Sequence, residues 1–160
     1  LRVIREADFI LIGPGNLYCS LIPNFLVSGI PEAIARSQAK KILNCNLMNK
    51  LGHSNNFTIF DYKHAIEKYL KSKLDAVIYN TQEPSKILLE KYRRGESEPV
   101  VAPVRRAKFI RDNTAFFGFP LVAEKPVKLS GFDILKRPLI RHNPKKLGRA
   151  IIKVTRLLRK

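Results

Sequence analysis

Short apolar runs, each followed by a turn or a polar segment, recur along the first half of the chain. They fall within residues 7–12, 41–46 and 75–80, which end at or just before Gly13, Asn46 and Asn80. Apolar runs of this length, without strict alternation of polar and apolar positions, are typical of strands buried on both faces of a parallel sheet. The pattern therefore predicts three buried parallel strands.

Helical periodicity separates these strand candidates. A helix is predicted from about Ser20, with Pro23 in its first turn, and a second one begins at Pro31. Apolar side chains then recur at helical spacing from Asp61 onward, and Ser85 is suited to cap the next helix. The alternation of strands and helices predicts an α/β fold, a doubly wound, mostly parallel Rossmann-like sheet with helices on both faces.

The second half is less regular until its end. Residues 100–102 and 120–123 are predicted to be short strands. Asn143 and Pro144 favour the start of a final helix, as its cap and first residue. That helix has an apolar face, formed by Leu147, Ile151, Val154 and Leu158. Lys and Arg occupy its other faces, which indicates an amphipathic docking helix with a cationic outer side.

The charge of the chain favours anionic partners. Its 160 residues contain 30 Lys and Arg against 13 Asp and Glu, a formal charge of +17. Such a field attracts nucleotides, nucleic acids or anionic lipid, although a generally basic composition explains the charge equally well. The chain has no apolar run near the roughly 20 residues of a membrane helix, and no nucleic-acid motif. Its two cysteines predict reduced thiols and a cytoplasmic location.

Two polar loops follow the first two predicted strands. Residues 13–20 combine two glycines with an amide and a hydroxyl, and residues 46–54 contribute amides, Lys50 and His53. Both loops are expected at the carboxyl edge of the sheet, where parallel α/β proteins bind ligands. The first loop is either a phosphate-binding loop or an ordinary turn between a strand and a helix. The second loop either contributes to the same binding site or is an ordinary exposed loop.

Other chemistry receives weaker support. Cys19, Cys45 and His53 lie near strand ends but lack the spacing of a zinc motif, so no metal site is predicted. His142 is expected to fix the turn before the last helix. The sequence shows neither a Ser-His-Asp order nor a pair of catalytic carboxylates.

Residues 7–27, A-D-F-I-L-I-G-P-G-N-L-Y-C-S-L-I-P-N-F-L-V, resemble the CofD/YvcK family. The pattern of its YvcK branch is A-D-x-I-x-x-G-P-G-S-L-Y-T-S-x-x-P-N-L-L-V. The second loop is similar to N-[IL]-M-T-Q-x-G-E-T in that branch, and residues 141–144 are similar to R-H-D-P. Departures from these patterns include Asn16 for Ser, Cys19 for Thr, His53 for Glu, Asn49-Lys50 for Thr-Gln, and Tyr62 for the His that follows Asp61.

The resemblance implies one of two functions. The YvcK-like gluconeogenesis factors bind a UDP-sugar and affect cell shape and carbon use, whereas the 2-phospho-L-lactate transferases couple an activated phospholactate to a deazaflavin with a divalent metal such as Mg²⁺. Asn16 fits the transferase pattern G-P-S-N-P-x-T-S, but Gly15, Leu17, Tyr18 and the second loop fit the YvcK branch. A nucleotide-sugar-binding regulator is therefore expected. The alternatives are a related phosphotransferase and, because of the charge, a nucleic-acid-binding protein.

The resemblance also implies a set of ligand-binding residues and a place in a larger domain. The expected ligand-binding residues are Gly13, Gly15, Asn16, Ser20, Asn24, Asn46, Lys50 and Asp61. Asp61 is equally suited to capping its helix. The family's Gly-rich G-G-G-T-G segment does not occur within residues 1–160, so the chain is expected to form the C-terminal part of one α/β domain and one wall of its cleft. Self-association remains open.

Overall fold

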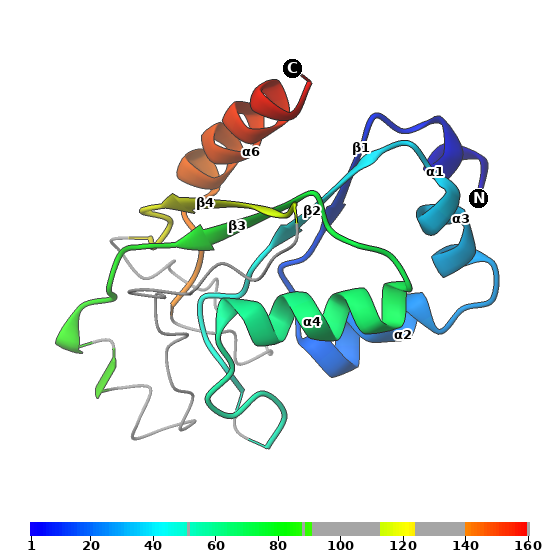
Figure 1. The fold of residues 1–160 in the computed structure, drawn as a ribbon. Coiled ribbons are helices and arrows are strands. Elements are labelled where there is room, and N and C mark those ends of the chain that lie inside the picture. Colours follow the sequence, from blue (N-terminus) through cyan, green and yellow to red (C-terminus); the bar gives the residue numbers. More distant parts are fainter. Residues whose placement is uncertain (51, 88, 91–112, 124–139, 160) are drawn as a thin grey trace, which may run out of the picture.

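A four-stranded parallel sheet forms the centre of the computed structural model, which describes residues 1–50, 52–87, 89–90, 113–123 and 140–159 (Figure 1). The strands are β1 (Phe9–Ile12), β2 (Lys40–Asn44), β3 (Ala76–Asn80) and β4 (Ala115–Phe119). They lie in the order β1-β2-β3-β4, and every neighbouring pair is parallel. The expected α/β class with a parallel sheet is confirmed.

Helices cover both faces of this sheet. The described helices are α1 (Arg2–Glu6), η1 (Leu17–Leu21), α2 (Ile22–Phe25), α3 (Ile30–Arg36), α4 (Ile59–Leu70) and α6 (Pro144–Leu158). In Figure 1, α6 lies on one side of the strands, and α2 and α4 lie on the other. Because successive side chains of a strand point to opposite faces, each strand contributes to two cores. Leu43 packs into the core beneath α4, whereas its neighbour Ile42 packs into the core beneath α6.

The first three predicted strands and the final helix are confirmed within one to two residues. Asn143 caps α6 as expected, because its side-chain oxygen accepts hydrogen bonds from the backbone N–H groups of Lys145 (3.0 Å) and Lys146 (3.1 Å). The helical segment after β1 begins at Leu17 rather than near Ser20, and its first turn is a π-helix. Asn16 caps this turn, so the sequence contains a local signal for the earlier start that the prediction did not use.

One predicted strand is misplaced. The fourth strand covers residues 115–119, whereas residues 120–123 contribute only a single antiparallel bridge between Val122 and His142. Phe116 packs against Phe60 on the α4 side, with ring centres 5.1 Å apart, and Phe117 packs on the α6 side. Successive aromatic side chains thus pack into the two cores in turn, which favours a strand at residues 115–119. The strand predicted at 100–102 and most of the helix predicted after Ser85 lie outside the described residues.

Within the described residues, no single helix is long and apolar enough to cross a membrane. One pair, Leu17–Phe25 and Ile30–Arg36, reaches the required length and composition together, but it is bent by 74° at the break between its two helices.

Candidate functional site

The two polar loops meet at the carboxyl edge of the sheet. Asn46, just after β2, is bonded to the backbone of Gly15, just after β1. The Gly15 N–H donates to the Asn46 side-chain oxygen (3.3 Å), and the Asn46 amide nitrogen donates to the Gly15 carbonyl (2.8 Å). A side chain that both accepts from and donates to one residue fixes the relative position of the two loops.

Glycine has a different role at each of two positions of the first loop. Gly13 has φ of +74°, and a Cβ built there would lie 3.1 Å from the Asn44 carbonyl oxygen. Gly15 lies outside the left-handed region, but a Cβ there would lie 3.0 Å from a methyl carbon of Leu21. Gly13 therefore needs glycine for its backbone conformation, whereas a side chain at position 15 would require Leu21 to shift.

Two other predicted residues, Asn16 and Asn24, stabilise the helical segment that begins at Leu17. The Asn16 side chain accepts from the Cys19 N–H (3.2 Å). The Asn24 amide donates to the carbonyls of Ser20 (2.5 Å) and Leu21 (3.3 Å). These two amides act locally, and the Ser20 side chain is exposed beside them.

The second loop is closed by its own hydrogen bonds. The Lys50 N–H donates to the Ser54 hydroxyl (2.9 Å), and the Lys50 carbonyl accepts from the N–H groups of His53 (3.0 Å) and Ser54 (2.9 Å). This leaves Lys50 exposed to solvent. A second contact between the loops is made by the Cys19 sulfur and His53 Nδ1, which lie 3.8 Å apart.

Asp61 is engaged at the start of α4. The N-cap residue is Thr58, and Asp61 is the third residue of the helix, so the two form a reciprocal capping box. Asp61 accepts from the Thr58 N–H (2.7 Å) and hydroxyl (2.6 Å). Partial burial by itself would raise the pKa of Asp61, but the hydrogen bonds from Thr58 and the nearby His64 lower it below its ordinary value. Its carboxylate therefore stabilises the helix start, whether or not it also contacts a ligand.

Buried polar atoms without hydrogen-bond partners occur on Asn44 at the end of β2, on Asn49 and Gln82 in the segments after β2 and β3, and on His142 just before α6. Among the described residues these are both side-chain atoms of Asn44, Oδ1 of Asn49, Oε1 of Gln82 and Nε2 of His142. The ring of His142 bonds to the backbone of Cys45, and burial lowers the pKa of His142 to about 4, so the ring is neutral near pH 7. Buried polar groups are usually paired with protein, water or ligand. Asn44, which the sequence analysis left out of the site, could have been noticed as a polar residue inside an apolar strand.

Metal ligands are not gathered at this edge. Cys45 is buried, and this raises the pKa of its thiol to about 12, so it remains protonated. Among the residues that the structure describes, no three His, Cys, Asp or Glu side chains are close enough together to hold a metal ion.

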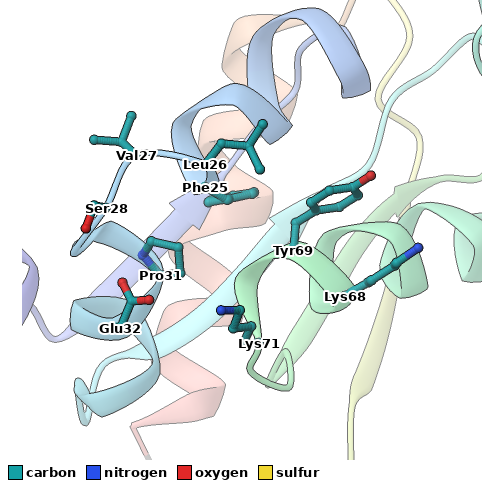
Figure 2. Close-up of a pocket in the computed structure, with 9 residues that line it drawn as sticks. All are labelled: Phe25, Leu26, Val27, Ser28, Pro31, Glu32, Lys68, Tyr69 and Lys71. Carbon is teal, nitrogen blue, oxygen red and sulfur yellow. The ribbon is translucent and has the colours of Figure 1, made fainter.

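A pocket of about 270 Å³ lies elsewhere, at the far end of α4 from Thr58 and Asp61 (Figure 2). Its lining residues are Phe25, Leu26, Val27, Ser28, Pro31, Glu32, Lys68, Tyr69 and Lys71. None of the eight predicted ligand-binding residues lines it. The candidate site is therefore the edge formed by the two loops, which is defined by hydrogen bonds and unpaired polar atoms rather than by this pocket.

The fold defines the chain as an α/β protein of the open parallel-sheet class, in which ligands bind at the carboxyl edge. Its residues 1–114 match the family described as 2-phospho-L-lactate transferase CofD, and the chain belongs to this CofD/YvcK family.

Curated relatives carry the name of one branch. A putative gluconeogenesis factor of Thermotoga maritima is 44% identical over 98 residues, covering 61% of this chain and 31% of that protein. One from Aquifex aeolicus is 39% identical over 155 residues, covering 94% of this chain and 42% of that protein. A crystal structure of a UPF0052 family member from Bacillus halodurans has a TM-score of 0.75 at 31% identity, covering 94% of this chain and 44% of that one. The chain thus spans less than half the length of these relatives.

Proposed function

We propose that this protein binds a nucleotide-sugar, specifically a UDP-sugar, at the carboxyl edge of its sheet. In this proposal it acts as a regulator of the gluconeogenesis factor type, with effects on cell shape and carbon metabolism. The observation that carries the proposal is the double hydrogen bond between Asn46 and Gly15, because it joins two loops that both leave the carboxyl ends of strands. The names of the relatives support the regulatory role.

The unpaired atoms at this edge suit a ligand rich in hydrogen-bond donors. The neutral ring of His142 leaves Nε2 as a buried acceptor, and Asn49 offers a buried carbonyl oxygen. Sugar hydroxyls and the N–H of uracil are donors of the required kind. Lys50, at the exposed side of the second loop, supplies a positive charge for the phosphates.

Calorimetric titration of UDP-N-acetylglucosamine tests the proposal. The 160-residue chain is expected to bind weakly, because it spans less than half of its relatives. A chimera, in which this chain replaces the aligned 44% of the Bacillus halodurans protein, should bind more tightly. That protein is measured alongside as the control. If it binds and a folded chimera does not, the loops of this chain do not form a UDP-sugar site.

A phosphotransferase is the second candidate, since the matched family is described by its transferase. That reaction would require a divalent metal such as Mg²⁺, and the described residues contain no group of three or more His, Cys, Asp or Glu side chains that could hold a metal ion. They contain no cluster of carboxylates, and Asp61 is bound to Thr58. Nucleic-acid binding rests on the charge of +17 alone. A cytoplasmic location and self-association stay predictions.

A further inference from the structure

Two residues that depart from the family pattern are in contact with each other. Cys19 stands where that pattern has Thr, and His53 stands where it has Glu. They are 34 positions apart in the sequence, yet the Cys19 sulfur lies 3.8 Å from His53 Nδ1. Within the described residues, this places a thiol of the first polar loop and an imidazole of the second together at the carboxyl edge.

The surroundings of the pair leave the thiol open to reagents. Cys19 is exposed, whereas Cys45, the other cysteine of the chain, is buried with only 1% of its surface accessible. The backbone N–H of Cys19 donates to the side chain of Asn16, which fixes the main chain that carries the thiol in the first turn of the helix. A thiolate is the nucleophilic form of cysteine, and an adjacent imidazole that takes up the thiol proton produces it.

We propose that Cys19 is a site of covalent modification by low-molecular-weight disulfides, with His53 as the acceptor of its proton. The Cys19 proton moves to His53 Nδ1, and the sulfur attacks one sulfur of the disulfide. A new bond forms between Cys19 and that sulfur, the original S–S bond breaks, and the second thiolate leaves and takes up the proton. Cys19 is oxidised, and the released half of the reagent is reduced to a thiol.

The consequence for ligand binding rests on the proposed function. Cys19 lies between Asn16 and Ser20, both predicted ligand residues. A substituent on its sulfur would therefore occupy the mouth of the first loop. Modification of Cys19 is expected to weaken binding of a nucleotide-sugar, and a reducing thiol should restore it.

Thiol reactivity is tested first, on the 160-residue chain itself. Iodoacetamide near pH 7 should add one group per folded molecule, at Cys19, and two groups after denaturation. His53→Gln keeps a polar side chain without a basic nitrogen, and it should slow the reaction about tenfold by removing the proton acceptor. Free imidazole should restore much of the rate in His53→Ala, which a purely structural role of His53 would not produce. An unchanged rate in His53→Gln, with the variant folded, would overturn the proposal.

The effect on binding is measured next, in the chimera. Oxidised glutathione should form a mixed disulfide at Cys19, seen by mass spectrometry, and lower the affinity for UDP-N-acetylglucosamine at least tenfold. Cys19→Thr carries the residue of the family pattern and should lose this sensitivity. If the modified chimera binds UDP-N-acetylglucosamine with unchanged affinity, modification of Cys19 does not affect the ligand site. Absence of binding by the unmodified chimera would contradict the proposed function, while the alkylation rates would still decide the thiol site.

Discussion

Glycine and asparagine shape the first loop at the residue scale. Gly13 provides a left-handed backbone conformation, and Gly15 leaves space for Leu21 while its N–H and carbonyl are bonded to Asn46. The engagement of the Gly15 N–H shows that this group does not stand free to bind an anion. A ligand at this loop would therefore contact the loop surface in the conformation that Asn46 stabilises, together with the exposed side chain of Ser20.

Substitution at Gly15 should impair ligand binding more than substitution at Ser20. In the chimera, Gly15→Val should abolish binding of UDP-N-acetylglucosamine, because its Cβ would meet Leu21 at 3.0 Å and displace the loop. Ser20→Ala removes one neutral hydroxyl, worth about 0.5–1.5 kcal/mol net, so affinity should fall no more than about tenfold. Calorimetry measures both variants.

The control for Gly15→Val is Gly148→Val in α6, where no atom outside the nearby backbone of the helix itself lies within 4 Å of the added Cβ. This variant should bind normally, and circular dichroism should show that both glycine variants retain their secondary structure. Normal affinity in a folded Gly15→Val variant would mean that the first loop is only a turn.

At the scale of elements, α6 is attached to the sheet through the segment before it. Val122 and His142 form an antiparallel bridge, and the ring of His142 reaches the backbone of Cys45 at the end of β2. The residue next to His142 is the helix cap, Asn143. The protonation state of the partly buried His142 imidazole is therefore linked to the docking of the whole helix.

Protonation of His142 should destabilise the fold below neutral pH. Burial lowers the pKa of His142 from 6.5 to about 4, so between these values the unfolded chain takes up a proton that the folded chain does not. The free energy of unfolding should fall as the pH is lowered from about 6.5 to 4, and no further loss should come from His142 below that range. Urea denaturation at a series of pH values measures this.

His142→Gln provides the comparison, because it cannot take up a proton. Its free energy of unfolding should vary less than that of the original protein between pH 6.5 and 4.5. Asp61 does not interfere in this range, since its pKa is lowered from 3.8 and it therefore acts at lower pH. An identical pH dependence in the two proteins would contradict the assignment to His142.

At the scale of the whole molecule, the described polar groups at the carboxyl edge are suited to hydrogen bonding and to contact with a negative charge. The carboxyl edge contains amides, a neutral imidazole and exposed Lys50, and the described part offers no carboxylate cluster for a metal. Such a set can hold a ligand through hydrogen bonds and charge.

The chimera should therefore form no deazaflavin–phospholactate product when it is given both transferase substrates and Mg²⁺. Mass spectrometry detects this product directly, and an authentic 2-phospho-L-lactate transferase serves as the control. Formation of product at an ordinary enzymatic rate would favour the phosphotransferase and reject the regulatory role.

The sequence by itself determined the fold class, most element positions and the family. Buried parallel strands require continuous apolar runs, and helices require apolar side chains at a spacing of three to four residues, so local patterns contain this information. Asn143 as a helix cap is equally local, because its partners are two and three residues away. The fourth strand was missed because its aromatic residues, with Gly118 among them, have no clear strand pattern.

Only the tertiary structure decided how the site is assembled. The bonds of Asn46 to Gly15 and of His53 to Cys19 join residues 31 and 34 positions apart, and no local rule pairs them. The same holds for Asn44 and His142, whose unpaired atoms become significant only because the fold buries them. Burial and contact between distant segments depend on the packing of the whole chain, whereas the tendency to form a helix or strand is set by neighbouring residues.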